Sequence, residues 1–69
     1  MKADFDSIKV DDKVRRYDSS DFPVLRVKKI MRLCKTVTLI DDRNGEEDYL
    51  IAKDFNGSQY YFFQLPMDL

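Results

Sequence analysis

Residues 36–63 read TVTLIDDRNGEEDYLIAKDFNGSQYYFF, and this stretch decides the fold. Two Asn-Gly pairs, Asn44-Gly45 and Asn56-Gly57, each lie between runs rich in Thr, Val, Ile, Tyr and Phe, which are residues that favour strands. Asn-Gly is the strongest short signal for a two-residue type I′ hairpin, because both turn positions need a positive φ. The stretch therefore predicts two successive hairpins, with strands at residues 36–42, 47–54 and 58–65.

Two further strands are expected before this meander, at residues 8–17 and 22–33, with a polar loop at residues 18–21 between them. The second begins near Pro23, where a missing N–H is tolerated. Residues 25–35 also partly fit helical spacing, whereas Val24, Val27 and Ile30 fit a strand that contains a bulge. Five short strands in 69 residues predict one all-β domain, residues 1–69, folded as a small five-stranded barrel.

The composition is that of a folded protein, with 43% hydrophobic and 36% charged residues. The single cysteine, Cys34, excludes an internal disulfide and is expected to be a buried free thiol in a reducing compartment. The chain has no apolar run of signal-peptide length and none approaching the roughly 20 residues of a membrane span. We therefore expect a cytoplasmic protein that does not enter a membrane.

Pairing across the two turns predicts which side chains share a face, since side chains alternate along a strand. It would place Leu39 opposite Leu50 and Val37 opposite Ala52. It would also oppose Asp41 and Asp48, an unfavourable pair of like charges that a slip in register or a bulge would relieve. The expected core is Val37, Leu39, Leu50, Ala52, Tyr61, Phe63 and Leu65.

The opposite face of the meander is unusually apolar for a solvated sheet face, and it includes Thr38. Either the face is covered within the chain, by the N-terminal residues with Phe5 and Ile8 or by a flattened barrel that partly buries both faces, or it binds a protein partner or a second copy of the chain. The second interpretation makes the following residues protein-binding candidates: Ile40, Tyr49, Ile51, Tyr60 and Phe62.

Basic residues concentrate in the first half of the chain. Residues 9–35 contain nine basic and four acidic side chains, whereas residues 36–69 contain two and seven. Neighbouring strands could gather the basic ones into a face that binds nucleic acid through its phosphates, although edge strands also carry Lys and Arg simply to prevent aggregation. The nucleic-acid-binding candidates are Arg15, Arg16, Arg26, Lys28, Lys29, Arg32 and Lys35.

The sequence lacks two features on which many enzyme sites depend. The chain contains no His and only two Gly, which leaves no usual general base and no glycine-rich phosphate loop. The acidic residues around the first Asn-Gly pair do not match the spacing of a calcium loop. We therefore expect no enzyme activity, no cofactor and no metal site.

The run IKVDDKV at residues 8–14, followed by residues 24–30 and by VTLID at residues 37–41, resembles the opening of small Src-homology-3-like barrels of the KOW, Tudor and bacterial or phage kinds. The resemblance implies a five-stranded Src-homology-3-like barrel. A Tudor-like member would build an aromatic cage, with Tyr17, Phe22, Tyr49 and Tyr60 as its candidates. The leading hypothesis is a non-enzymatic protein-interaction module, such as a small accessory or inhibitory protein of phage or bacterial origin, and the alternative is a small nucleic-acid-binding barrel.

Overall fold

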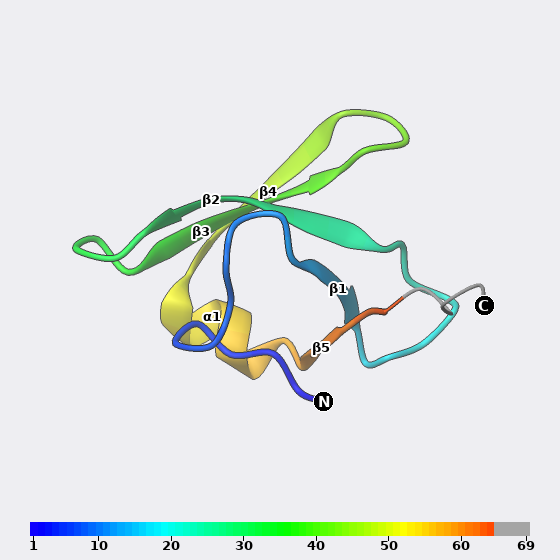
Figure 1. Cartoon of the computed structure of the whole chain (residues 1–69), viewed down its shortest axis with the longest axis horizontal. Coiled ribbons are helices and arrows are strands. Elements are labelled where there is room, and N and C mark those ends of the chain that lie inside the picture. The colour runs from blue at the N-terminus through cyan, green and yellow to red at the C-terminus, as the bar shows by residue number, and fades with distance from the viewer. Residues whose placement is uncertain (65–69) are drawn as a thin grey trace.

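A computed structural model of the chain describes residues 1–64. Its elements in chain order are β1 (Lys13–Arg16), β2 (Leu25–Met31), β3 (Thr36–Asp41), β4 (Glu46–Ile51), α1 (Ala52–Gly57) and β5 (Tyr60–Phe62) (Figure 1). The prediction of an all-β fold is confirmed, with one short helix added. The expected core residue Leu65 and the end of the last expected strand lie outside the described residues.

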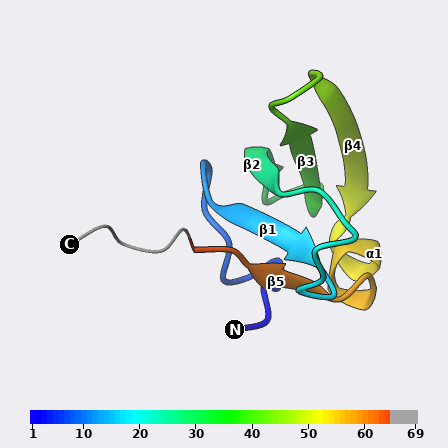
Figure 2. The ribbon, with the colours of Figure 1, turned by 90° about the vertical axis from the view of Figure 1, so that its right-hand side faces the viewer.

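The strands form one antiparallel sheet in the order β4-β3-β2-β1-β5. β5 pairs with β1, and no pairing joins β4 to β5 within residues 1–64. The sheet curls, and α1 lies between the end of β4 and the start of β5 (Figure 2). The sheet is therefore open at this point, and a closed barrel stays a prediction.

The second predicted hairpin is wrong, because residues 52–57 form α1. Gly57 ends the helix and does not have a positive φ. The helix buries Phe55 completely and stacks its ring on Tyr60, with 5.0 Å between the ring centroids. The Oδ1 atom of Asn56 accepts a hydrogen bond from the backbone N–H of Phe5 at 2.8 Å. Burial of one large ring thus outweighs the local turn signal of Asn-Gly.

The first predicted hairpin is confirmed in place, although its turn is a four-residue loop at residues 42–45. Only Gly45 has a positive φ there, 75°. Val37 pairs with Leu50, so the register differs by two residues from the expected one and separates Asp41 from Asp48. A shift of two keeps each side chain on its own face, which is why Val37 remains buried as expected.

The second expected strand exists as β2 and is not a helix. It contains the bulge, located between Val27 and Lys29. The strand ends at Met31 rather than at Leu33, which lies fully exposed in the loop to β3. Cys34 is in the same loop and is exposed, so the expectation of a buried thiol is wrong.

The core lies on the concave face of the sheet. The expectation that Tyr61 and Phe63 face the core is wrong, because β5 pairs with β1 and turns Tyr60 inward instead. Ala52 packs against the core from α1 and is only half-buried. The buried apolar side chains are Ala3, Phe5, Ile8, Val14, Leu25, Val27, Val37, Leu39, Phe55 and Tyr60.

Residues 1–12, called the N-terminal segment below, contain no strand, although residues 8–12 were expected to start one. The segment contributes Phe5 and Ile8 to the core. Its beginning runs along β5, where Lys2 forms a single bridge with Tyr61 and the backbone N–H of Ala3 donates to the Tyr60 carbonyl at 2.8 Å. This segment therefore covers part of the otherwise free edge of β5.

Candidate functional site

Four apolar side chains lie together on the convex face of β2, β3 and β4. Tyr49 pairs with Thr38, and Thr36 lies between Met31 and Ile51 in the sheet register. Tyr49 is 65% exposed, Ile51 49% and Met31 38%. We call this group the outer patch: Met31, Ile40, Tyr49 and Ile51.

The outer patch keeps three of the five protein-binding candidates and loses the other two. Tyr60 belongs to the core with 6% exposure, and Phe62 packs against that core. Both face inward because they pair with Arg16 and Val14 of β1, not with β4. Their expected place on the same face as Tyr49 is therefore wrong.

The N-terminal segment does not cover the outer patch. Its Phe5 and Ile8 belong to the core on the concave face, while Tyr49 and Ile51 stay exposed. The interpretation in which this segment folds over the apolar face of the meander is therefore wrong.

Three nucleic-acid-binding candidates form ion pairs with carboxylates. Arg26 donates to both carboxylate oxygens of Asp42 at 2.9 Å, and its Nη1 atom donates to Asp11 at 3.1 Å. The Arg26 guanidinium lowers the pKa of Asp42 through these hydrogen bonds. Two further pairs are Lys28 with Glu47 at 2.8 Å and Arg15 with Asp18 at 3.4 Å.

Two other candidates hold the chain together. Arg32 donates to the carbonyl oxygens of Phe5 at 2.6 Å and of Ile8 at 2.9 Å, and its guanidinium lies 5.0 Å from the centre of the Phe5 ring. The Nε atom of Arg16 donates to the Ser58 carbonyl at 3.2 Å. These two arginines thus fasten the N-terminal segment and the turn before β5.

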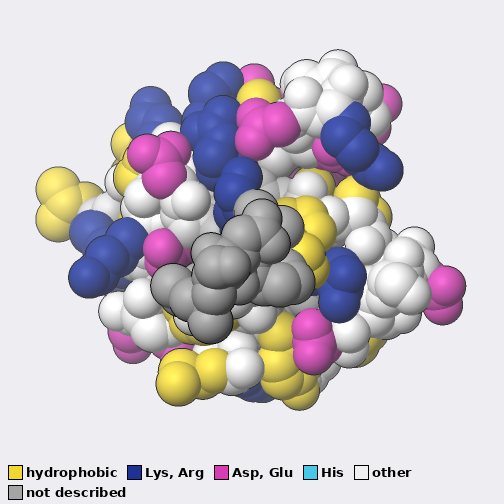
Figure 3. Space-filling model, turned by 45° about the vertical axis from the view of Figure 1, so that its right-hand side comes forward, with side chains coloured by type: hydrophobic (Ala, Val, Ile, Leu, Met, Phe, Trp, Pro, Cys, Tyr) yellow, Lys and Arg dark blue, Asp and Glu magenta, His cyan; other side chains and the backbone are white. Residues whose placement is uncertain are grey.

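Lys29 and Lys35 are the candidates whose side chains form neither an ion pair nor a hydrogen bond in the part of the chain that the structure describes. On the face drawn in Figure 3, Asp and Glu side chains lie beside the Lys and Arg side chains. The structure therefore does not gather the seven basic candidates into one uniform basic surface.

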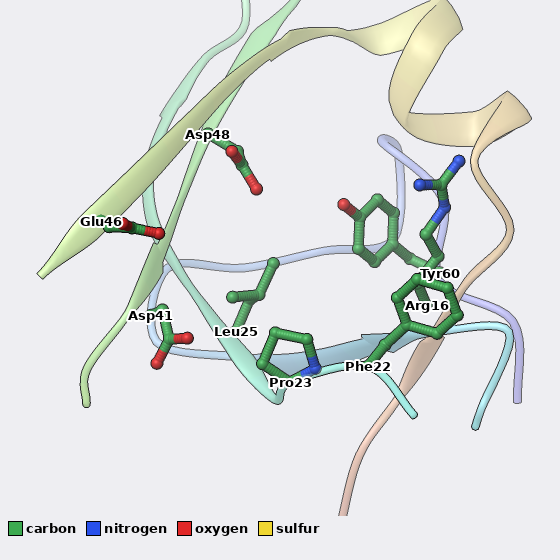
Figure 4. A pocket seen from close by; sticks show the side chains of 8 residues that line it. All are labelled: Arg16, Phe22, Pro23, Leu25, Asp41, Glu46, Asp48 and Tyr60. Atoms are coloured by element: carbon green, nitrogen blue, oxygen red, sulfur yellow. The ribbon is translucent and has the colours of Figure 1, made fainter. Parts of the chain in front are cut away.

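A groove that the sequence did not reveal lies on the concave side, where the sheet is open. Its volume is about 160 Å³. Asp41, Glu46 and Asp48 line one wall (Figure 4). Opposite them are Arg16 and Tyr60, and the apolar part of the lining comes from the loop before β2 and its first residue. We call it the acidic groove, lined by Arg16, Phe22, Pro23, Leu25, Asp41, Glu46, Asp48 and Tyr60.

The carboxylates face this groove because of the register of β3 and β4. Asp48 pairs with Leu39, and Glu46 pairs with Asp41, so all four side chains point toward the concave face. The unfavourable opposition of acidic residues in the expected register was the one signal in the sequence for this site. Whether these acidic residues line a groove depends on the register of β3 and β4 and on the position of β5, which the sequence pattern does not give.

The charges in the groove are not equivalent. Arg43 donates twice to the buried carboxylate of Asp41, at 3.1 and 2.9 Å, and lowers its pKa. Glu46 and Asp48 form no ion pair within residues 1–64. Burial raises the pKa of Tyr60, and the charge of Asp48 raises it further. Two unpaired carboxylates therefore give this wall a negative potential.

The aromatic residues do not form the cage expected of a Tudor-like barrel. Tyr17 and Phe22 meet edge to face at 5.6 Å, but the Arg16 guanidinium lies over both rings, at 5.1 and 5.8 Å from their centres. Tyr49 lies on the convex face and Tyr60 in the groove. The structure therefore does not bring these four candidate rings together.

Residues 1–64 contain no group of three or more His, Cys, Asp or Glu placed to hold a metal ion. In the same range, no helix is both long and apolar enough to span a membrane. Comparisons of the chain with protein-family models, with curated proteins and with solved structures gave no match.

Proposed function

We propose that this chain is a non-enzymatic protein-interaction module, a small cytoplasmic accessory or inhibitory protein of phage or bacterial origin that binds another protein through the outer patch. The observation that carries the proposal is the exposure of Tyr49 and Ile51, 65% and 49%, side by side with further apolar side chains. Contiguous exposed apolar side chains usually mark an interaction site. Tyr is also among the residues that contribute most to binding energy.

The Src-homology-3-like barrel is part of this proposal. Strands β1 to β4 follow one another across the sheet, and β5 returns after a short helix to pair with β1. A five-stranded Src-homology-3-like barrel has this strand order, so the order supports the proposal. The pairing of β4 with β5 that would close the barrel is not present within residues 1–64.

The partner that we propose is a different protein rather than a second copy. β4 is an edge strand that carries Glu46, Glu47 and Asp48 in succession, and charges on an edge strand disfavour pairing with an identical edge. A stable interface buries about 800 Å² per partner, which is more than four partly exposed side chains provide. We therefore expect a monomer in solution and a transient complex with a partner that also contacts residues around the patch.

The test places a photo-reactive benzoyl-phenylalanine at position 49, in cells that produce the protein, and at position 33 as a matched exposed control. We expect one discrete adduct from position 49 that position 33 does not give. The partner identified from it should then bind Ile51→Ser at least tenfold more weakly, and Leu33→Ser unchanged. A tenfold loss corresponds to about 1.4 kcal/mol.

Equal adducts from both positions, or full binding by Ile51→Ser, would contradict the outer patch as the binding site. Light scattering tests the choice of partner. A mass twice that of the single chain, reduced to the monomer mass by Ile51→Ser, would mean that a second copy occupies the patch.

Nucleic-acid binding stays a prediction from the sequence. Because Arg26 and Lys28 are neutralised by carboxylates and Arg32 binds backbone carbonyls, we expect only weak binding of labelled DNA or RNA in fluorescence anisotropy. Micromolar affinity at physiological salt, lost in the double variant Lys29→Glu and Lys35→Glu, would overturn this expectation.

A further inference from the structure

The acidic groove combines charge and apolar surface in a way that the fold itself does not use. Glu46 and Asp48 point to the concave side of the sheet, where Leu39 and other neighbours are buried. Neither carboxylate forms an ion pair within residues 1–64. Two like charges beside an apolar lining repel each other, and a cation placed between them would relieve this repulsion.

Tyr60 supplies a second, independent observation. The residue is more than nine-tenths buried, with 6% exposure. Its hydroxyl makes no hydrogen bond in the described part of the chain, although it is directed into the groove toward the wall that carries Asp48 (Figure 4). The hydroxyl is not one of the fully buried polar atoms that lack a partner, so it is open to the groove and available as an acceptor to a ligand there.

The rest of the lining consists of Asp41, which is paired with Arg43, of Arg16, whose Nε atom donates to the Ser58 carbonyl, and of apolar side chains that suit the stem of a long side chain. Phe22, Pro23 and Leu25 provide an apolar surface next to the carboxylates. Lys and Arg bury their methylene stems on such surfaces and keep the charged end among polar groups. The groove, at about 160 Å³, is smaller than the roughly 300–1,000 Å³ of typical small-molecule pockets, and it therefore fits one side chain of a larger partner.

We propose that the acidic groove binds a Lys side chain from an extended basic peptide segment of another protein. The ammonium lies between the carboxylates of Glu46 and Asp48 and donates to the hydroxyl of Tyr60. Its methylene stem packs on Phe22 and Leu25. The groove and the outer patch are on opposite faces of the sheet, so this proposal stands or fails independently of the proposed function.

The test is fluorescence anisotropy of a labelled peptide of alternating Lys and Leu, titrated with the purified chain. We expect micromolar binding that weakens several-fold as salt rises from about 50 to 500 mM, because the contacts are ionic. The double variant Glu46→Gln and Asp48→Asn should bind at least tenfold more weakly. Glu47→Gln is the matched control, since Glu47 faces the convex side and pairs with Lys28, and it should bind as the unaltered chain does.

Two further measurements identify the chemistry. Tyr60→Phe keeps the stacking on Phe55 and removes only the hydroxyl, so it should weaken binding two- to fivefold while the melting temperature stays close to that of the unaltered chain. A peptide with trimethylated Lys has no N–H donor and should bind more weakly than the unmodified one, because the site binds the ammonium through hydrogen bonds.

Several outcomes would overturn the proposal. Equal losses in Glu47→Gln and in the double variant would mean attraction by the overall acidic surface rather than by the groove. Tighter binding of the trimethylated peptide would mean recognition by aromatic faces. If spermine displaces the labelled peptide at a lower concentration than unlabelled peptide does, the groove is a site for a small-molecule polyamine. Binding unaffected by Tyr49→Ser is expected, since that residue belongs to the outer patch alone.

Discussion

Replacing the two glycines by alanine, one at a time, tests the helix that takes the place of the second expected hairpin. Gly45 has a φ of 75°, a region in which an L-residue costs roughly 1–2 kcal/mol. Alanine also restricts the unfolded chain, which offsets about 0.4–1 kcal/mol of this. Gly57 has no positive φ, and a Cβ added there meets no atom within 4 Å. We expect Gly45→Ala to lower the free energy of unfolding by about 1 kcal/mol and Gly57→Ala to raise it by about 0.5 kcal/mol.

The assay is urea unfolding followed by far-UV circular dichroism, with thermal melting in parallel. A change of 1 kcal/mol moves the melting temperature of a domain of this size by about 4–8 °C, so the two variants should differ by several degrees in opposite directions. The reasoning is refuted if Gly57→Ala destabilises the chain as much as Gly45→Ala does. That result would mean that Gly57 has a positive φ, as the type I′ hairpin requires.

Three other substitutions test the core, the loop of the first hairpin and the N-terminal segment. Phe55→Ala should lower the free energy of unfolding by about 3–5 kcal/mol, since the ring is fully buried. Leu33→Ala, at a fully exposed site, should change it by no more than about 0.5 kcal/mol in the same urea titration. A near-neutral Phe55→Ala would place this ring outside the core. Arg43 holds the pKa of Asp41 below its ordinary 3.8, so the ionised carboxylate stabilises the fold above that value, and this stabilisation is lost as the pH falls through the lower folded-state pKa. Asp41→Asn should therefore lose less stability on acidification than the unaltered chain does. An identical pH dependence of the two proteins would exclude the effect. Arg32→Met removes two hydrogen bonds to backbone carbonyls and should cost about 1.5–3 kcal/mol, with faster amide exchange in the N-terminal segment; exchange unchanged there would show that Arg32 does not hold it.

Much of the sheet could be predicted because its signals are local. Alternation along residues 36–41 identifies Val37 and Leu39 as core residues whatever the register, since an error of two leaves the faces unchanged. The bulge after Val27 explains why β2 partly imitates helical spacing. The first Asn-Gly pair marks a true reversal of the chain. Each of these features depends on residues close together in sequence.

The errors at residues 52–63 have one physical origin, which is a tertiary contact that overrides a turn signal. Residues 52–57 carry Asn-Gly, but the helix buries Phe55 against Tyr60, and no local pattern reports that contact. Once a helix replaces the hairpin, β5 pairs with β1 and its inward and outward residues differ from those expected. The candidate site shows the same contrast between local and tertiary signals. The exposed positions of Tyr49 and Ile51 could be predicted from their own strand, whereas the buried position of Tyr60 could not.

The acidic groove could not be predicted for a related reason. Its lining comes from β1, the loop before β2, the first residue of β2, the end of β3, the first half of β4, and β5. These parts meet only when the last strand lies beside the first. The concentration of acidic residues near Asn44 was visible in the sequence, but whether those residues faced solvent or the concave side depended on the register.

The bridge between Lys2 and Tyr61 bears on the order in which the molecule assembles. The pairings among β2, β3 and β4 join neighbours along the chain and form with little loss of loop entropy, whereas β5 and the first residues must come together from opposite ends. Contacts that close late and lie at a sheet edge are also among those that open in local fluctuations. Tyr60 belongs to this late-closing strand and accepts the hydrogen bond from Ala3. The side of the acidic groove that carries Tyr60, opposite the carboxylates, is therefore completed in the last step of folding and is the first part to be lost when the ends separate.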